Sequence, residues 1–246
     1  MGSLSKWLRR YGNACPHRKV SLPSHVWKTG KVDFIVDHRE KGAVTAVQDQ
    51  GHCGSCWSFA TVGAVEGAWA AAGNKLLPLS VEELVQCDKM MLNSGCDGGV
   101  MQYSFEWIIR NGGIASAETF PYISGKLPYK DDGTCKTRVK LARNVTIRDY
   151  CDIDYRDMLG LEQAVVRQPV AVAVQAQQMA FRFYHGGIIS SSKCESRIDH
   201  GLLLKHFWLL KNSWGDDWGE DGYVRLEKEA GVSTCGVGDA ASYPIV

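Results

Sequence analysis

The sequence predicts an α+β fold in two lobes, with a helical N-terminal half and a mostly β-stranded C-terminal half. Apolar residues recur at helical spacing in several segments between residues 56 and 113. Beyond about residue 145, short β-rich runs alternate with glycine-rich turns. With 246 residues and 45% hydrophobic content, the chain can bury a substantial core. Two lobes imply a cleft between them, which is a common place for an active site.

Three segments are predicted to be helices. Residues 56–72 (CWSFATVGAVEGAWAAA) carry apolar residues at helical spacing and stop before Gly73, a residue type that often ends helices. Ser80 and Glu83 fit a capping box at the start of LSVEELVQC, and a third helix, SFEWIIRNGG, is expected to end on its glycine pair. Predicted strands follow at VAVAV, LLL, FWLL and YVRL, in residues 170–226.

Charge and hydropathy exclude some classes of partner. Lys and Arg number 28 against 27 Asp and Glu, so the net charge of +1 leaves no electrostatic footprint for nucleic acid or an anionic membrane. No stretch approaches the roughly 18 apolar residues of a membrane span, and the N-terminus lacks the apolar region of a signal peptide. We therefore expect no nucleic-acid partner and no membrane partner.

The cysteine content points to an oxidising compartment. Nine cysteines are scattered along the chain and do not follow metal-finger spacing, which favours disulfides. An odd number leaves at least one thiol unpaired within the chain. Such a thiol is a candidate nucleophile.

Cys56 is the strongest candidate for that nucleophile. It follows a glycine-rich loop that starts at Gln50, and it opens the first predicted helix. The positive end of a helix dipole favours a thiolate, the reactive form of cysteine. The backbone amide of Cys56 would face the oxyanion that forms on an attacked carbonyl, and Gln50 could supply a second donor.

Two other interpretations of this loop were weighed. Cys53 and Cys56 form a C-x-x-C pair, as in thioredoxin-like redox sites, and His52 could join them in a zinc site. A redox pair is expected to follow a strand in a βαβ unit, and a zinc site needs a second ligand pair. The sequence offers neither, so nucleophilic catalysis is favoured.

A catalytic cysteine needs a distant histidine, and a third group that orients it. Among seven histidines, His200 alone opens a β-like run, and the return run ends in Lys211 and Asn212. A hairpin closing near His206 would bring His200 and Asn212 side by side. The competing interpretation is that a lone histidine beside a strand is structural.

Several separate motifs in this sequence resemble papain and cathepsin L, from about Val36 to Val246. They are Gln50, Cys53-Gly-Ser-Cys56-Trp57, Gly95-Cys96-Asp97-Gly98-Gly99, Asp199-His200-Gly201 and Asn212-Ser213-Trp214-Gly215. In detail they are similar to kinetoplastid cathepsin L-like enzymes. The resemblance implies a papain-like fold with a helical left lobe (41–148), an antiparallel β-barrel right lobe (32–40 and 149–246) and the cleft between them. Residues 1–31 would be a residual pro-segment or N-terminal arm.

The resemblance also implies a role for each site residue. Cys56 would be the nucleophile of a thiol endopeptidase, Gln50 an oxyanion donor, Asn212 the residue that orients His200, and Trp214 its shield from water. Gly98 and Gly99 would hydrogen-bond the substrate backbone, with Asp199 nearby. The pocket for the second residue upstream of the cut (P2) would be lined by Met101, Ala173, Ile198 and Ala240. Because all four are apolar, we expect a hydrophobic residue at P2.

The resemblance implies disulfides between Cys53 and Cys96, Cys87 and Cys135, and Cys194 and Cys235, with no family partner for Cys15 or Cys151. Expected partners are peptide or protein substrates and cystatin-like inhibitors, with a monomeric chain, no cofactor and no metal. A lysosomal, endosomal or secreted zymogen is implied, and Asn144 begins a glycosylation sequon.

Three features depart from the family pattern. Only a tail of the usual inhibitory pro-region is recognisable, in residues 10–13. His38 stands where a tryptophan is usual. The hairpin between His200 and Asn212 is shorter and lacks a glycine-containing turn, with Lys205 and His206 in its place. The alternative hypothesis is therefore a catalytically impaired papain-fold protein that binds peptides or inhibitors.

Overall fold

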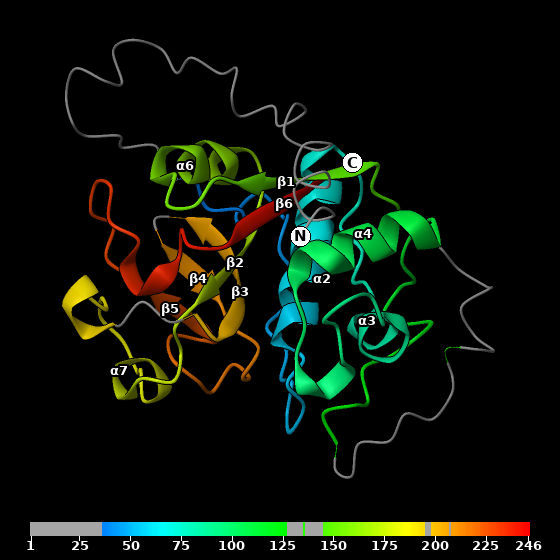
Figure 1. Cartoon of the computed structure of the whole chain (residues 1–246), viewed down its shortest axis with the longest axis horizontal. Coiled ribbons are helices and arrows are strands. Elements are labelled where there is room, and N and C mark those ends of the chain that lie inside the picture. Colours follow the sequence, from blue (N-terminus) through cyan, green and yellow to red (C-terminus); the bar gives the residue numbers. More distant parts are fainter. Residues whose placement is uncertain (1–35, 127–134, 136–144, 195–197, 207) are drawn as a thin grey trace, which may run out of the picture.

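The computed structural model describes residues 36–126, 135, 145–194, 198–206 and 208–246. Its helices and strands separate into two groups, with α2, α3 and α4 on one side and most of the sheet with α6 and α7 on the other (Figure 1). The first group consists of α2 (Cys56–Ala71), α3 (Val81–Cys87), α4 (Met101–Asn111) and the short 3-10 helix η2 (Gly95–Asp97).

The predicted helix boundaries are nearly right, because the terminating residues act as expected. Helix α2 ends just before Gly73, whose φ is +90°, and α4 ends at Gly112 in the left-handed conformation with φ of 73°. Ser80 caps α3 by accepting a hydrogen bond from the Glu83 amide at 2.9 Å. The Ser80 amide, which a capping box would direct to Glu83, instead donates to the Ala115 carbonyl at 2.9 Å, and the Glu83 carboxylate accepts from the Ala115 amide at 2.6 Å.

The second group is built on one antiparallel sheet with the strand order β1-β6-β2-β3-β4-β5. Its strands are β1 (Asp149–Ile153), β2 (Val170–Val174), β3 (His200–His206), β4 (Leu209–Lys211), β5 (Tyr223–Arg225) and β6 (Ala241–Ile245). The antiparallel α+β prediction is therefore confirmed. The lobe boundaries given above stay a prediction.

Helical segments also occur in the half that was expected to be mostly strand. They are α6 (Met158–Arg167), α7 (Met179–Arg182) and the 3-10 helices η3 (Ser191–Lys193) and η4 (Thr234–Gly236). Helix α6 was missed although Asp157 is a good cap residue, accepting from the Gly160 amide at 2.9 Å. Its buried face packs on the sheet through Leu161, Ala164 and Val165.

The two groups meet where α2 lies against β3. Glycine at position 63 allows this approach, because a Cβ there would lie 2.9 Å from a methyl carbon of Leu203. One turn later, a Cβ on Gly67 would lie 2.4 Å from the ring of Pro169. Leu203 and Ala171 on the sheet are accordingly part of the same buried cluster as the helices. The sheet thus positions β3, and the residues at its start, directly against the helix that carries Cys56.

The shortened hairpin closes with an irregular register. Leu203 pairs with Lys211 and Leu204 with Leu210, and a shift follows before His206 pairs with Leu209. Extending the regular register by one step places Asn212 opposite Leu202. His200 lies two residues before Leu202, so its side chain is on the same face of the sheet as that of Asn212. The side chains of Lys205 and His206 lie outside the described part of the chain.

His38 is buried, with 1% of its surface exposed. Its Nε2 lies 2.6 Å from the carbonyl oxygen of Val165 at the end of α6, so a polar bond holds the position that is apolar in the family. No helix in the described residues is both long and apolar enough to span a membrane. Residues 1–35, with Cys15, and Asn144 lie outside the described residues.

Two of the three implied disulfides are present, Cys53 with Cys96 and Cys194 with Cys235. The implied Cys87–Cys135 bond is not formed, and both residues are free thiols. The two thiols are nevertheless in hydrogen-bond contact, and the pKa of Cys87 is raised by burial and by that contact. Cys151, for which the resemblance implied no family partner, is itself disulfide-bonded.

Candidate active site

Cys56 lies at the first position of α2, at the junction of the two groups of elements. Because the helix begins there, the amide of Cys56 is not used by hydrogen bonds within the helix and stays available to a ligand. The loop before it is held by the disulfide of Cys53 with Cys96 and by Tyr122. The Tyr122 hydroxyl contacts the Ser55 hydroxyl at 2.8 Å and donates to the Gln50 carbonyl at 2.8 Å.

His200 and Asn212 are joined by a hydrogen bond of 2.7 Å between Nε2 and Oδ1. The same Oδ1 accepts the backbone N–H of Ser213 at 2.9 Å. Because that N–H can only donate, the atom facing it has to be the carbonyl oxygen of Asn212, and Nε2 of His200 has to be the donor. Nδ1 is then the ring nitrogen left for Cys56. Asn212 therefore fixes both the orientation and the tautomer of the imidazole.

The electrostatics favour charge separation between Cys56 and His200. Burial opposes the ionisation of Cys56, but the charge of His200 and its hydrogen bond outweigh burial and lower the pKa of the thiol. Burial likewise opposes protonation of His200, and the charge and hydrogen bond of Cys56, with help from Asn212 and Asp199, raise its pKa. The two shifts have a common cause, because each group stabilises the charged form of the other, and their contact therefore favours a thiolate and an imidazolium.

Gln50 is held where an oxyanion donor is needed. Its Nε2 donates to the Cys53 carbonyl at 2.7 Å, and its Oε1 accepts from the Ser213 hydroxyl at 2.7 Å. The Gln50 amide also donates to the Ser213 carbonyl at 2.8 Å. The second N–H of the carboxamide is not used by these contacts, and it can converge with the Cys56 amide on developing negative charge. Sequence reasoning named Ser213 only as part of a motif and missed its role as the holder of Gln50.

An aromatic wall covers the histidine. The ring of Trp214 lies 4.9 Å from that of His200, and Phe181 meets both rings edge-on at 6.3 Å and 5.8 Å. Trp218 packs against Trp214 at 5.2 Å. This wall limits the access of water to the bond between His200 and Asn212. Trp214 was predicted from the sequence, whereas Phe181 and Trp218 were not, because no local pattern marks them as neighbours of the site.

Contacts around Gly201 connect Met101, Ala173 and Ala240, which are expected to line the P2 pocket. Ala173 pairs with Gly201 across β2 and β3, and its amide donates to the Ala240 carbonyl at 2.8 Å. A Cβ on Gly201 would lie 3.3 Å from the sulfur of Met101 and 3.3 Å from the Cys56 carbonyl oxygen. Ile198 contacts the backbone at Gly236, four residues before Ala240.

Gly98 and Gly99 follow η2 in the helical group, and Gly98 has a φ of +111° with open space where a side chain would point. A side chain on Gly99 would instead collide with the indole of Trp57, 2.5 Å away. Asp199, His200 and Trp214 line one further pocket. The Oδ1 atom of Asp199 accepts the Ala176 amide at 2.8 Å.

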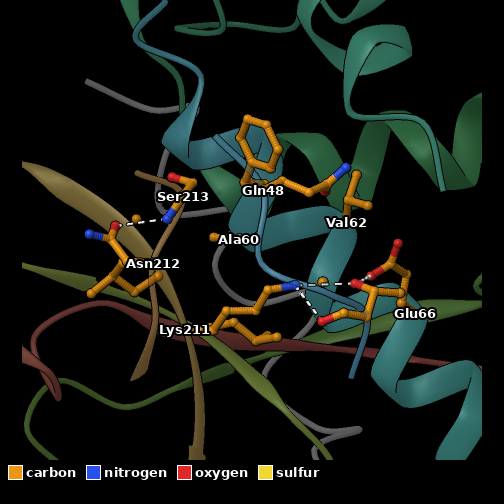
Figure 2. Close-up of a pocket in the computed structure, with 13 residues that line it drawn as sticks. Gln48, Ala60, Val62, Glu66, Lys211, Asn212 and Ser213 are labelled. Atoms are coloured by element: carbon orange, nitrogen blue, oxygen red, sulfur yellow. Dashed lines mark hydrogen bonds between the residues drawn. The ribbon is translucent and has the colours of Figure 1, made fainter. Parts of the chain in front are cut away.

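A polar junction ties the strand before Asn212 to α2, and sequence reasoning missed it (Figure 2). Lys211 donates to the Thr45 carbonyl at 2.9 Å and to its hydroxyl at 3.2 Å, and that hydroxyl donates to Glu66 at 2.7 Å. Burial lowers the pKa of Lys211 to about 8 and raises the pKa of Glu66, whose other oxygen accepts the Leu79 amide. A cavity beside these groups extends to Asn212 and Ser213.

The zinc and redox interpretations of the loop do not fit this arrangement. Cys53 is bonded to Cys96, so it cannot exchange disulfides with Cys56 in the state described. No group of three or more His, Cys, Asp or Glu side chains among the described residues could hold a metal ion. A free thiol paired with an oriented histidine is left as the chemistry of this site.

Comparison with known proteins agrees with that geometry. The family model described as papain family cysteine protease matches residues 33–245. This chain belongs to the papain family of cysteine proteases. A papain-family relative from rice (Oryza sativa subsp. japonica), cysteine endopeptidase RepA, is 43% identical over 224 residues, which is 85% of this chain and 57% of the relative.

Two solved papain-family structures share the fold. The ragweed pollen allergen Amb a 11, a cysteine protease seen in its proform, has a TM-score of 0.81 at 36% identity and covers 95% of this chain and 69% of its own. Bromelain from Ananas comosus, in complex with the E64 inhibitor, has a TM-score of 0.73 at 32% identity, covering 86% and 98%. The relatives are plant proteins, so the kinetoplastid likeness stays a prediction. This chain spans little more than half the length of the rice relative.

We predict that replacing His200 raises the pKa of Cys56. In His200→Ala, burial is no longer offset by an imidazolium, so the thiolate should appear only at higher pH. The alkylation rate of Cys56 by iodoacetamide at pH 6 should fall more than about tenfold, since each pKa unit changes the thiolate fraction about tenfold. His185→Ala, in an exposed loop, is the matched control. An unchanged rate profile in His200→Ala would contradict the ion pair.

We predict that Lys211→Met lowers the free energy of unfolding by about 3 kcal/mol at pH 7, where Lys211 is mostly protonated, because it leaves Glu66 buried without its cation. The folded-state pKa of Glu66 is raised, so the stability linked to its proton is complete below about pH 4.5 and is lost as the pH rises through that folded pKa. The loss should therefore be smaller at pH 5. Urea unfolding measures both values.

The exposed Lys41→Met is the control for this substitution. Adding Glu66→Gln to Lys211→Met should restore most of the stability, because the uncompensated carboxyl is then gone. If Lys211→Met were as stable as Lys41→Met at pH 7, the junction would have no role in joining α2 to the sheet.

Proposed function

We propose that this chain is a thiol endopeptidase that hydrolyses peptide bonds through an acyl-enzyme on Cys56. The observation that carries the proposal is the free thiol at the start of α2 in hydrogen-bond contact with His200, whose Nε2 is bonded to Asn212 at 2.7 Å. The same arrangement argues against a catalytically impaired binding protein, since the shortened hairpin still leaves His200 within reach of both partners.

The geometry supports a two-stage reaction. The Cys56 thiolate attacks the peptide carbonyl, and the oxyanion is stabilised by the Cys56 amide and the Gln50 carboxamide. His200 then gives its Nδ1 proton to the departing amine, which leaves a thioester on Cys56. In the second stage, neutral His200 takes a proton from water as that water attacks the thioester. The carboxylic acid is released, and the thiolate and imidazolium are regenerated.

We propose that substrates carry a hydrophobic residue at P2. Support comes from the contacts that join Met101, Gly201, Ala173 and Ala240 on one side of Cys56. All the side chains in this set are apolar or absent, so a charged P2 side chain would lose its hydration without gaining a partner.

We further propose a monomeric zymogen-derived enzyme in a lysosomal, endosomal or secreted compartment, inhibited by cystatin-like proteins. The disulfides favour an oxidising compartment. The ragweed relative is described in its proform, which supports synthesis as a precursor. We also propose the lobe division at residues 41–148, with 32–40 and 149–246 in the second lobe, because the buried clusters follow it closely.

The function is tested by labelling with an epoxysuccinyl peptide and by hydrolysis of a fluorogenic Phe-Arg peptide. We expect the label on Cys56 and none on Cys56→Ser. Gln50→Ala should keep the label but hydrolyse the peptide about 10² to 10³ times more slowly, because an oxyanion donor is lost. Cys87→Ser removes a buried thiol that takes no part in the contacts among Cys56, His200, Asn212 and Gln50, and it should behave like the parent chain. A folded parent chain that takes no label would overturn the proposal.

The P2 preference is tested with peptides that differ only at P2. We expect Leu, Phe or Val to exceed Arg in kcat/KM by roughly tenfold or more. Ala240→Glu should reverse part of this difference by supplying a carboxylate for Arg, whereas Ala72→Glu, at the exposed end of α2, should not. Equal or better cleavage of the Arg peptide by the parent chain would show that the pocket is not apolar.

A further inference from the structure

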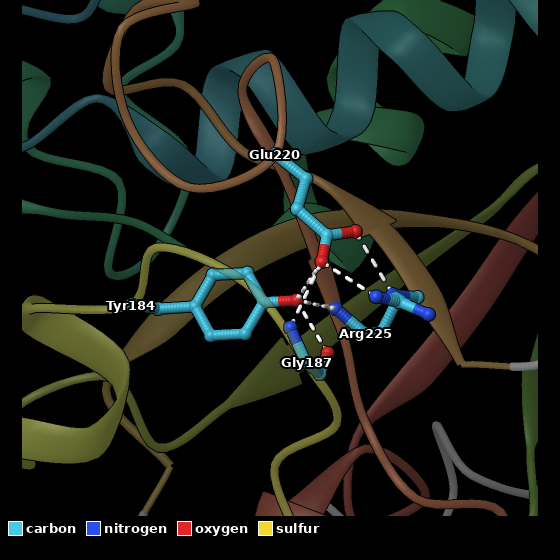
Figure 3. A network of polar contacts seen from close by, with 4 residues as sticks. All are labelled: Tyr184, Gly187, Glu220 and Arg225. Atoms are coloured by element: carbon cyan, nitrogen blue, oxygen red, sulfur yellow. Dashed lines mark hydrogen bonds and ion pairs between the residues drawn. The ribbon is translucent and has the colours of Figure 1, made fainter.

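A polar network joins Tyr184, Gly187, Glu220 and Arg225 (Figure 3), and it adjoins the aromatic wall because the ring of Tyr184 packs on Trp218. Glu220 is at its centre and accepts hydrogen bonds from the Gly187 amide at 3.0 Å and the Tyr184 hydroxyl at 3.1 Å. Its two oxygens also receive the Arg225 guanidinium at 2.7 Å and 2.8 Å. The hydrogen bond from Arg225 is the main cause that lowers the pKa of Glu220. The segment 184–187, the loop that carries Glu220 and strand β5 thus meet at one carboxylate.

One of these segments is the loop that leaves Asn212 and carries both tryptophans of the wall. This loop closes on itself, with the Asn212 amide bonded to the Gly222 carbonyl at 2.9 Å and the Gly222 amide bonded to the Trp218 carbonyl at 2.8 Å. The Glu220 amide bonds the Tyr223 carbonyl at 2.9 Å at the start of β5. The position of Glu220 therefore constrains the whole loop from Asn212 to Gly222.

A chain of ring contacts runs from the network to the catalytic histidine. The ring of Tyr184 packs on Trp218 at 5.8 Å, Trp218 packs on Trp214 at 5.2 Å, and Trp214 lies 4.9 Å from His200. The Trp218 indole N–H donates to the Arg182 carbonyl at 3.2 Å, which fixes the plane of that ring. The Tyr184 hydroxyl also lies 2.7 Å from the Gly187 carbonyl oxygen, so its single hydrogen is shared between that oxygen and Glu220, and the tyrosine is held at both its ring and its hydroxyl.

We propose that Tyr184, Glu220 and Arg225 are positioning residues that hold the aromatic wall over the bond between His200 and Asn212. The inference rests on the proposed roles of His200 and Cys56. Their link to His200 runs through the ring contacts of Tyr184 with Trp218 and of Trp218 with Trp214, so they act indirectly. When the network is intact, the wall keeps water from competing for the Asn212 oxygen, and the imidazolium keeps its partner.

The alternative is that the network serves only overall stability. The Arg225 and Glu220 side chains are 48% and 30% exposed, and an ion pair between such exposed groups contributes little to the free energy of folding. A purely structural role would therefore leave a weak effect on stability and none on the site. A positioning role also predicts a small change in stability, but it differs in predicting a clear change in the ionisation of Cys56.

The direction of that change follows from the charges around His200. Cys56 on α2, Asp199 next to His200, and Arg182 on α7 are the titratable groups that face it, and Asn212 is its neutral partner. Loosening Trp214 lets the imidazole ring move away from Asn212 and Cys56, so the short-range contacts that raise the pKa of His200 weaken while the ring stays buried. A less stable imidazolium stabilises the Cys56 thiolate less, so the pKa of Cys56 should rise.

The test is the pH dependence of Cys56 alkylation by iodoacetamide, quantified on the Cys56 peptide by mass spectrometry. We expect Glu220→Ala and Tyr184→Phe to move the midpoint of the rate profile to higher pH by about half a unit or more. At a pH below the parent midpoint, this shift corresponds to a rate at least about threefold lower. Glu220→Gln keeps an oxygen for Tyr184 and Gly187 but loses the charge, so an intermediate shift is expected.

The matched control is Glu162→Ala, which removes a carboxylate of similar exposure (27%) from another ion pair of the same lobe. Its midpoint should equal that of the parent chain. Identical midpoints in Glu220→Ala, Tyr184→Phe and the parent chain would overturn the proposal, as would an equal shift in Glu162→Ala. If Glu220→Ala does not fold, Tyr184→Phe decides, because it removes a single hydroxyl.

Alkylation requires only the Cys56 thiolate and does not require peptide hydrolysis. A parent chain that is alkylated with a low midpoint but cleaves no peptide would contradict the endopeptidase function and leave the positioning inference standing. A parent chain that cleaves peptides, with variants of unchanged midpoint, would contradict the positioning inference and leave the endopeptidase function standing. The two proposals therefore fail on different measurements.

Discussion

The close approach of α2 to β3 brings a thiol at one helix end to an imidazole at one strand end. Glycine at position 63 permits this contact with Leu203, and the helix then presents Cys56 beside His200. Burial by itself would keep both groups neutral, because each pays a desolvation cost when charged. Their mutual attraction outweighs that cost only at short range, so the reactivity of the site depends on how firmly the helix and the sheet are held together.

Four consecutive residues, beginning with the last residue of β4, carry most of that task, and each makes a different contact. Lys211 donates to Thr45, whose hydroxyl donates to Glu66. Asn212 orients His200, Ser213 donates to Gln50, and the ring of Trp214 covers His200. Because alternate side chains of an extended chain point to opposite faces, a single short segment can serve both the interior junction and the cleft. A shift of this segment would disturb the oxyanion donor and the histidine together.

The shortened hairpin is tolerated for the same reason. The irregular register between Leu204 and His206 absorbs the change at the far end of the hairpin, and the regular pairs Leu203 with Lys211 and Leu204 with Leu210 lie on the side of the site. Side-chain orientation depends on the parity of the register, which these pairs preserve. A shorter hairpin therefore keeps the side chains of His200 and Asn212 on one face of the sheet as long as that parity is preserved.

The sequence by itself determined the helix that carries Cys56, the caps and glycines that bound it, and strand β2, because these depend on local periodicity and terminating residues. It also singled out His200 and Asn212, which the resemblance to papain supported. Helix α6 was missed because its ten residues lie among β-rich runs, and their helical face has meaning only against the sheet. The tertiary structure alone decided the junction of Lys211 with Glu66, the hold of Ser213 on Gln50, and the network around Glu220. These contacts join residues far apart in the chain, and no local pattern records which distant side chain will share a buried space.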